Sequence, residues 1–160
     1  MRRRLVVIAT DPADVVRYAG GWLFDRALAG WDVRVLTDVR ADTRPLRILG
    51  ARPFDLESAL AAPVRGPRPD AFGVSAELYA TDPRVRDLVR DGLDWGVSDC
   101  RLWSEHWCGM DGEDTERHRL SAAARAFKTH ALLAAAAPLS DAVPTESFRR
   151  AGALHPSPAG

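Results

Sequence analysis

The sequence predicts a single α/β domain with a Rossmann-like, mostly parallel sheet and helices on both faces, and three observations support this. The chain has 160 residues, of which 46% are hydrophobic and 28% are charged, so it can bury one core. Short β-branched apolar runs alternate with segments in which apolar residues recur at helical spacing. Residues 5–38 form a βαβ unit, whose crossover we expect to be right-handed. We assign residues 1–137 to this domain.

The βαβ unit is the clearest part of the pattern. Residues 5–9 are an almost wholly apolar run, as expected of a parallel strand that is covered on both faces. After a turn at residues 10–12, apolar side chains recur at helical spacing over residues 16–27, and Gly30 favours a helix stop. Residues 33–36 then predict a second strand.

Weaker signals predict the next elements. Residues 44–50 are a short helix candidate, and residues 54–56 are a brief extended piece. A proline-punctuated loop leads to a third apolar run at residues 71–74, which predicts a strand. Asp82 and Pro83 open a further helix, with Asp82 as its N-cap.

The last third of the chain is predicted to hold one more strand and one long helix. The strand falls at residues 100–103, and a turn-rich segment at residues 109–114 separates it from a helix that starts near Thr115. An apolar stripe at intervals of three and four extends this helix up to Pro138. Residues 138–160 carry four prolines and little apolar periodicity, so we expect a loosely packed or disordered tail.

Composition excludes several classes of function. Twenty-two basic residues balance twenty-two acidic ones, so no global field favours a nucleic acid or a membrane surface. No apolar run reaches about 18 residues, and the short run after the opening arginines is not typical of a signal peptide. Two cysteines are too few to staple the domain, which favours a cytoplasmic location. The use of Arg in place of Lys indicates GC-rich bacterial coding, and we give it no functional weight.

Several local motifs follow one known pattern. A strand is followed by Asp-Pro-Ala-Asp at residues 11–14, the helix after it contains the pair Gly20-Gly21, and Gly30 precedes a strand that ends at Thr37. Weaker echoes, including Asp-Pro-Arg-Val at residues 82–85, extend to about residue 133. In these motifs the chain resembles the PIG-L/LmbE-like family of zinc-dependent deacetylases, which remove N-acetyl groups from amino-sugar conjugates.

The resemblance implies a zinc site whose chemistry is largely replaced in this chain. In the family, the first His and last Asp of His-Pro-Asp-Asp bind zinc together with a later His, and the third residue is the general base. Here Asp11 and Asp14 take the first two ligand positions. Ala13 takes the position of the base, Pro83 that of the third ligand, and Ala80 that of the family's other His. We therefore expect a catalytically degenerate member and no cofactor.

The candidate ligand contacts lie near the predicted strand ends. They are Asp11, Asp14, Gly20, Gly21, Thr37, Asp38 and Arg84. Asp11 and Asp14 are also the candidate ligands for a hard divalent cation, with Asp38 or Asp82 as the nearest guesses for a third group. The structural alternative makes Asp11 an Asx turn and Asp14 the cap of a helix that begins at Val15. The glycine pair fits equally a close approach to a ligand and tight helix packing.

Two further groups have a structural interpretation as well as a functional one. The spacing of Cys100, His106 and Cys108 matches no strong zinc signature, so we expect Cys100 to pack in a strand and His106 to lie in a loop. Trp103 and Trp107 either line a pocket or an oligomer contact, or pack in the core.

Three functions stay open from the sequence. The leading one is a small-molecule-binding or protein-interaction module that uses the crevice at the strand ends. The second is a divergent metal-dependent hydrolase built on Asp11 and Asp14, and the third is a structural subunit of a homo-oligomer or of a complex with an active homologue. No motif supports nucleotide binding or covalent catalysis.

Overall fold

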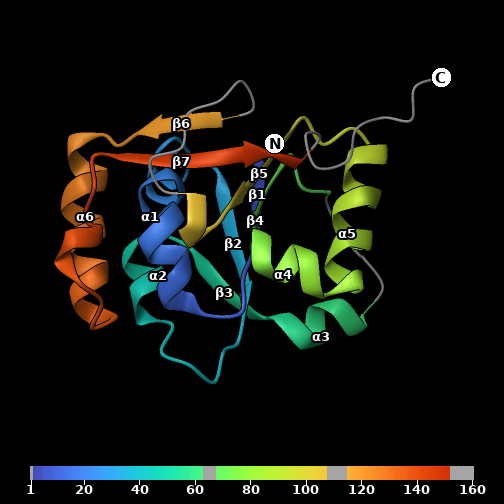
Figure 1. Ribbon diagram of the computed structural model, residues 1–160, viewed down its shortest axis with the longest axis horizontal. Helices are drawn as coiled ribbons and strands as arrows, with labels where there is room; N and C mark the ends of the chain where they lie inside the picture. The colour runs from blue at the N-terminus through green and yellow to red at the C-terminus, as the bar shows by residue number, and fades with distance from the viewer. Residues whose placement is uncertain (1, 63–67, 108–114, 152–160) are drawn as a thin grey trace.

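A computed structural model describes residues 2–62, 68–107 and 115–151, and its centre is a seven-stranded sheet (Figure 1). From one edge to the other the strands are β3 (Arg52–Asp55), β2 (Asp32–Thr37), β1 (Arg4–Ile8), β4 (Ala71–Ser75), β5 (Asp99–Trp103), β7 (Thr145–Arg150) and β6 (Thr115–Arg119). The first five of these run parallel, β7 runs antiparallel to β5, and β6 runs antiparallel to β7. This is the mostly parallel α/β sheet that the sequence predicts.

Helices cover both faces of the sheet. One layer holds α1 (Pro12–Leu28), α2 (Arg44–Ile48) and α6 (Ala122–Ala134), and the other holds α3 (Leu56–Ala61), α4 (Ala76–Thr81) and α5 (Pro83–Asp94). Two short 3-10 helices complete the described chain, η1 (Glu105–Trp107) and η2 (Leu139–Asp141). Figure 1 shows the first layer to the left of the strands and the second to the right. None of the described helices is long and apolar enough to cross a membrane.

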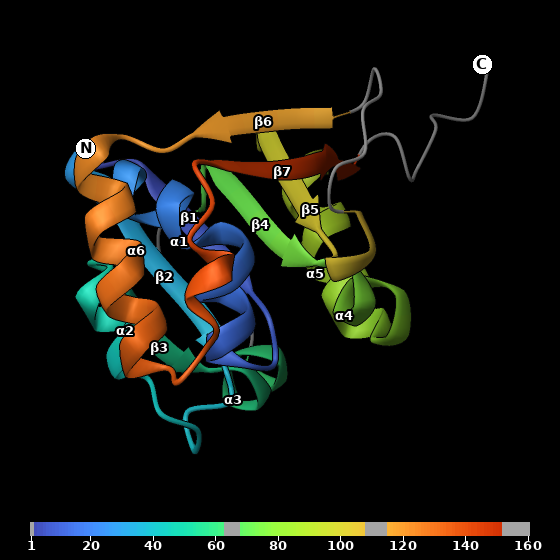
Figure 2. The same cartoon turned by 60° about the vertical axis from the view of Figure 1, so that its left-hand side comes forward.

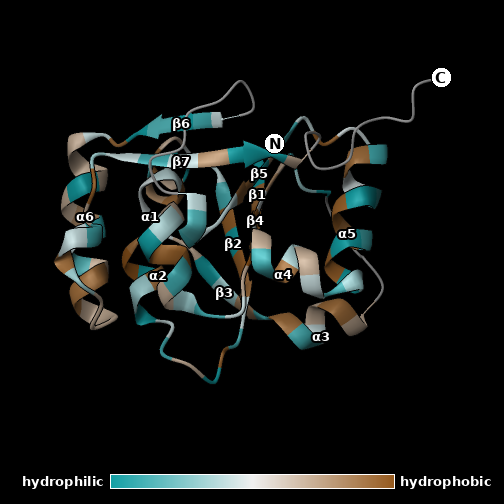
Figure 3. Ribbon diagram, in the orientation of Figure 1, coloured by the Kyte–Doolittle hydropathy of each residue, from teal (hydrophilic) through white to brown (hydrophobic). Residues whose placement is uncertain are grey.

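The apolar residues of each face form a cluster with one helix layer. Trp22 of α1 packs beneath β7, with its ring 5.0 Å from that of Phe148, and Phe72 faces α5 on the other side. A side chain at Gly73 would lie 2.6 Å from the Trp22 ring, so the glycine allows Trp22 to lie against the sheet. In Figure 3 the central strands β1 and β4 are largely brown, whereas β6 at the sheet edge is mostly teal.

The predicted elements up to residue 103 are present with small shifts of their ends. The βαβ unit is β1-α1-β2, the third predicted strand is β4, and the strand predicted at residues 100–103 is β5. Asp82 caps α5 as expected, because its side chain accepts a hydrogen bond of 2.9 Å from the Arg84 amide. The short pieces predicted near residues 44–50 and 54–56 are α2 and β3.

The prediction for the last third was wrong in two places. The segment from Thr115 to Arg119 is strand β6, and the helix begins only at Ala122, after the N-cap Ser121. The supposed tail contributes η2 and β7 to the fold, so the domain extends through Ala151. Figure 2 shows β7 beside β6 along this part of the sheet. Residues 152–160 lie outside the described part of the chain.

Candidate ligand-binding cleft

The carboxyl ends of the parallel strands meet at one edge of the sheet, where α/β proteins bind ligands. From β1 the chain passes outward to β2 and β3, and it then returns to place β4 and β5 on the other side of β1. The crevice between β1 and β4 is therefore the point at which the strand order reverses. Asp11 and Asp14 follow β1 there, and Glu77 follows β4.

Asp11 is the cap of α1, and the prediction that Asp14 caps a helix beginning at Val15 was wrong. The helix begins at Pro12, and the Asp11 side chain accepts a hydrogen bond of 3.0 Å from the Ala13 amide. This contact is also the Asx turn expected for Asp11. Pro12 at the first helical position has no N–H to satisfy, which favours a start one turn earlier than predicted.

Asp14 lies in the first turn of α1 with several other carboxylates around it. Burial raises the pKa of the Asp14 carboxyl above its ordinary value, and the nearby Asp11 carboxylate raises it further. Arg17 acts in the opposite direction, while Glu105 and Glu77 also raise the pKa. A positively charged group placed beside Asp14 would relieve this repulsion.

Glu77 is a polar residue of this crevice that the sequence analysis missed. Its carboxylate accepts hydrogen bonds from the Ser104 hydroxyl at 2.5 Å and from the Ser75 hydroxyl at 3.3 Å. Ser75 ends β4 and Ser104 directly follows β5, so the two strand ends hold Glu77 from both sides. The position of the two serines at strand ends was the available signal, because parallel strands bring their carboxyl ends together.

Of the residues predicted after β2, Thr37 is structural and Asp38 faces the crevice. The Thr37 side chain is fully buried, and its hydroxyl donates to the Thr10 carbonyl at 2.9 Å, which joins the ends of β1 and β2. Asp38 accepts two hydrogen bonds from the Arg40 guanidinium, at 2.9 and 3.0 Å, and these bonds lower the pKa of its carboxyl. Both partners of this pair are open to solvent, so water or a ligand can replace either one.

Arg84 holds two carboxylates at the far side of the crevice. It donates to Glu57 at 2.9 and 3.0 Å and to Asp82 at 2.9 and 3.1 Å. These hydrogen bonds raise the pKa of the Arg84 guanidinium and lower the pKa of the Glu57 and Asp82 carboxyls. The ion pair between Arg84 and Glu57 links the start of α5 to α3.

Asp38, Glu57 and Asp82 line a cleft of about 410 Å³ at the strand ends, whereas Asp11, Asp14 and Glu77 are not among its lining residues. Its lining residues are Thr10, Asp38, Arg40, Asp55, Leu56, Glu57, Leu78 and Asp82. Four of them are carboxylates and only one is a guanidinium, and Arg84 pairs with two of the four. The cleft is therefore acidic, although the whole chain has no net charge.

The glycine pair lies half-way along α1 and is buried. A methyl group at Gly21 would come within 2.2 Å of the Leu120 side chain, and one at Gly20 would lie 3.2 Å from Leu49. These contacts favour tight helix packing over a close approach to a ligand as the reason for the glycine pair.

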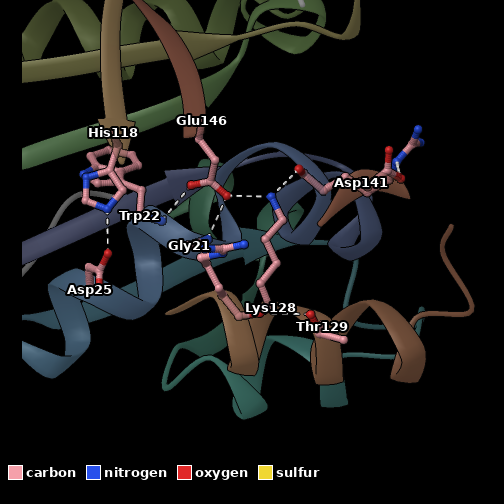
Figure 4. A network of polar contacts seen from close by, with 10 residues as sticks. Gly21, Trp22, Asp25, His118, Lys128, Thr129, Asp141 and Glu146 are labelled. Atoms are coloured by element: carbon pink, nitrogen blue, oxygen red, sulfur yellow. Dashed lines mark hydrogen bonds and ion pairs between the residues drawn. The ribbon is translucent and has the colours of Figure 1, made fainter. Parts of the chain in front are cut away.

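Gly21 also borders a buried polar network that the sequence did not reveal (Figure 4). The Glu146 carboxylate of β7 accepts hydrogen bonds from the amides of Gly21, at 2.8 Å, and Trp22, at 2.7 Å. Lys128 of α6 donates to Glu146 and to the Arg17 carbonyl, each at 2.7 Å. Both charged side chains are almost completely buried. The network ties α1, α6 and β7 together from the interior.

The cysteine and tryptophan candidates have mainly packing roles in the described chain. Burial raises the pKa of the Cys100 thiol to about 12, as expected of an inert residue within a strand. His106 lies in η1, and Cys108 falls outside the described residues. Trp103 is buried in the core, whereas Trp107 is partly exposed beneath the Arg149 guanidinium.

Comparisons with known proteins bear on the fold. No protein-family model matches the sequence, and the search of curated proteins finds no match. Among solved structures, a triple mutant of a deacetylase from the teicoplanin biosynthetic pathway aligns with a TM-score of 0.60 and 14% identity, covering 92% of this chain and 97% of the other. This chain has a deacetylase-like α/β fold.

Two further solved structures share the fold. The zinc-inhibited form of the teicoplanin deacetylase Orf2 aligns with a TM-score of 0.54 at 15% identity, covering 92% of this chain and 98% of the other. GalB, the 4-carboxy-2-hydroxymuconate hydratase from Pseudomonas putida KT2440, aligns with a TM-score of 0.56 at 14% identity, with coverages of 88% and 81%. The same framework therefore serves more than one reaction.

The side chains at the strand ends do not fit a catalytic zinc site of the family's type. Zinc in such sites has three protein ligands drawn from His, Cys and carboxylates, together with a bound water. Of the three ligand positions that the resemblance implies, those of Asp11 and Asp14 offer oxygen atoms and that of Pro83 offers no side-chain donor. Among the described residues, no group of three or more His, Cys, Asp or Glu side chains is arranged to hold a metal ion.

Proposed function

We propose that this domain is a catalytically degenerate relative of the deacetylases and binds a small polar molecule that carries a positively charged nitrogen. The observation that carries the proposal is the acidic cleft at the strand ends, which is present although Ala13 and Pro83 stand at the motif positions of the base and the third ligand. On this proposal the domain has a binding cleft and lacks the groups that the family uses for hydrolysis.

The charge of the cleft defines the ligand. Asp38, Asp55, Glu57 and Asp82 line it; Arg40 pairs with Asp38, and Arg84 pairs with Glu57 and Asp82, which leaves more carboxylates than guanidiniums. A protonated amine or guanidinium gains hydrogen bonds to such carboxylates, and charge-assisted bonds of this kind are stronger than neutral ones. Because the side chains of Asp38 and Arg40 are exposed to solvent, a ligand can compete with Arg40 for the Asp38 carboxylate.

Leu56 and Leu78 supply the apolar part of the lining, and Thr10 adds a hydroxyl. A pocket with apolar walls and a few convergent polar groups is typical of small-molecule sites, and the volume lies at the lower end of their usual range. The site therefore suits one compact polar molecule better than a long chain.

The proposal is tested by NMR titration of the ¹⁵N-labelled protein with glucosamine, using glucose as a neutral probe of similar shape. We expect glucosamine to shift the amide signals of residues that line the cleft, such as Asp38, Leu56 and Glu57, and glucose to shift them far less. Asp38→Asn should weaken the response, whereas Asp91→Asn, an exposed substitution on α5, should leave it unchanged. Equal responses to both sugars, or shifts elsewhere on the surface, would refute a cationic ligand for this cleft.

A metal-dependent hydrolase is the second candidate, and the observation that favours it is the group of carboxylates around Asp14. Asp11, Glu77 and Glu105 all raise the pKa of Asp14, and a divalent cation would relieve that repulsion as well as an amine does. Glu77 acts on Asp14, whereas Asp38 and Asp82, suggested from the sequence as a third group, are paired with arginines. The described residues hold no ready-made group of three metal ligands, so this candidate requires the carboxylates to move on binding. Metal content separates the two candidates.

A further inference from the structure

A second charged surface lies along β1, β2 and the edge strand β3. Along β2, Val33 and Val35 are buried, while Asp32 and Arg34 point to the other face and remain partly exposed. The neighbouring edge strand β3 exposes Arg52 and Phe54 on this face, and the register places Arg52 directly beside Arg34. Arg4 of β1 lies opposite Asp32. We call Arg4, Asp32, Arg34, Arg52 and Phe54 the arginine patch.

The arginine patch carries more positive than negative charge. The Asp32 carboxylate accepts hydrogen bonds from Arg4 at 3.1 Å, from Arg34 at 3.2 Å and from Arg52 at 2.9 Å. The Asp70 carboxylate also lies at Arg4, where it accepts a hydrogen bond of 2.8 Å from the Arg4 backbone amide. Three guanidiniums with two carboxylates leave an excess of one positive charge. The side chain of Arg52 is 57% exposed and that of Arg34 is 30% exposed, so both can reach a further anion.

An aromatic ring lies among these guanidiniums. Arg34 and Arg52 lie 5.2 and 5.8 Å from the centre of the Phe54 ring, and Phe54 is 37% exposed. The arrangement repeats beside the patch, where Arg3 and Arg26 lie 5.6 and 5.1 Å from the ring of Trp31, the residue before Asp32. Ring contacts hold the guanidiniums in place, which reduces the entropy that binding would cost.

We propose that the arginine patch is a docking surface for an acidic segment of a partner protein. The segment would bring carboxylates to Arg34 and Arg52 and an apolar side chain to Phe54. The planar guanidinium matches a carboxylate with two parallel hydrogen bonds, and Arg and aromatic residues are enriched where protein partners bind most strongly.

Charge and size favour a protein segment over a nucleic acid. A typical nucleic-acid site neutralises about six to ten phosphates along a track of positive charge. The patch offers three guanidiniums that already share one carboxylate, on a chain with no net charge. This extent fits a few carboxylates on a short segment.

The test measures fluorescence anisotropy of a fluorescein-labelled hexaglutamate peptide with the full chain at low and at physiological salt. Hexaglutamine is the neutral control, and a single-stranded DNA dodecamer is the nucleic-acid control. We expect hexaglutamate to bind and hexaglutamine not to bind. Arg34→Gln/Arg52→Gln should weaken binding by roughly fivefold or more, whereas Arg47→Gln/Arg125→Gln, which removes the same charge from exposed positions elsewhere, should change it by less than about twofold.

A gain-of-function variant keeps the test independent of folding. Asp32→Asn removes the carboxylate that the three arginines share, so hexaglutamate should bind more tightly to this variant than to the parent. Three outcomes would overturn the proposal: no binding of hexaglutamate, equal loss in both double variants, or tighter binding of the DNA than of hexaglutamate.

Discussion

Both the interior network around Glu146 and the cleft pair carboxylates with cationic side chains. The first is buried, whereas the second is exposed to solvent. Glu146 has its hydrogen bonds supplied by Lys128 and two helix amides, away from water. Asp38 in the cleft is held by Arg40 alone, in contact with solvent. A buried ion is costly to leave without a partner, whereas an exposed pair exchanges readily with water. The first group therefore stabilises the fold, and the second is available to a ligand.

The largest effect expected from this comparison is that of Lys128→Met. The substitution keeps the volume of the side chain but leaves the Glu146 carboxylate buried with no cation, which should lower the free energy of unfolding by about 3–5 kcal/mol. Urea unfolding followed by circular dichroism measures the loss. Lys128→Met/Glu146→Leu should recover part of it, because both charges are then absent. A loss below about 1 kcal/mol in the single variant would mean that the network is not a stabilising feature.

A smaller loss is expected from Gly21→Ala, with Gly20→Ala as its matched control. The new methyl group at position 21 would overlap Leu120, so we expect a loss of about 1–3 kcal/mol in the free energy of unfolding. The methyl group at position 20 meets Leu49 at 3.2 Å, and the better helix propensity of Ala offsets part of that contact. Equal unfolding midpoints for the two variants would contradict the assignment of close packing to Gly21.

Gly21 and Glu146 show which contacts could not be predicted from the sequence. Periodicity predicted α1 and the glycine pair was noticed, but its partners Leu120 and Glu146 lie about a hundred residues further along the chain. The strand β7, Thr-Glu-Ser-Phe-Arg-Arg, has the polar alternation of an edge strand, yet it lies between β5 and β6. Its Glu146 can be buried only because α1 donates two amides, and no local pattern encodes that contact.

The cleft was predicted better than the interior network for a physical reason. The carboxyl ends of parallel strands converge whatever their side chains, so locating β1 and β2 also located Asp38 of the cleft and Asp11 and Asp14 at the end of β1. The roles of these residues were less accessible. Whether Asp11 or Asp14 caps α1 depends on the residue at which the first turn of the helix starts. The ends of helices are the weakest part of such predictions.

The smallest expected effect, of opposite sign, is that of Asp14→Asn in the first turn of α1. Because the pKa of the Asp14 carboxyl is raised in the folded state, its ionised form is destabilising there. The protonated Asp14 carboxyl contributes to stability at pH values below the pKa of an unfolded Asp. This contribution is lost as the pH rises through the pKa of Asp14 in the folded state. At neutral pH Asp14→Asn should raise Tm by a few degrees, and the gain should vanish in acid. Calorimetry across this range measures it, and a gain that does not depend on pH would contradict the assignment.

The most direct measurement for the central claim is metal content by inductively coupled plasma mass spectrometry, on protein purified without chelator or added metal. Asp14→Ala serves as the control, because Asp14 is the ligand position that the family resemblance retains. The binding-domain account predicts substoichiometric metal in both proteins. Near one equivalent of a divalent metal in the parent, lost in Asp14→Ala, would contradict it and favour the hydrolase.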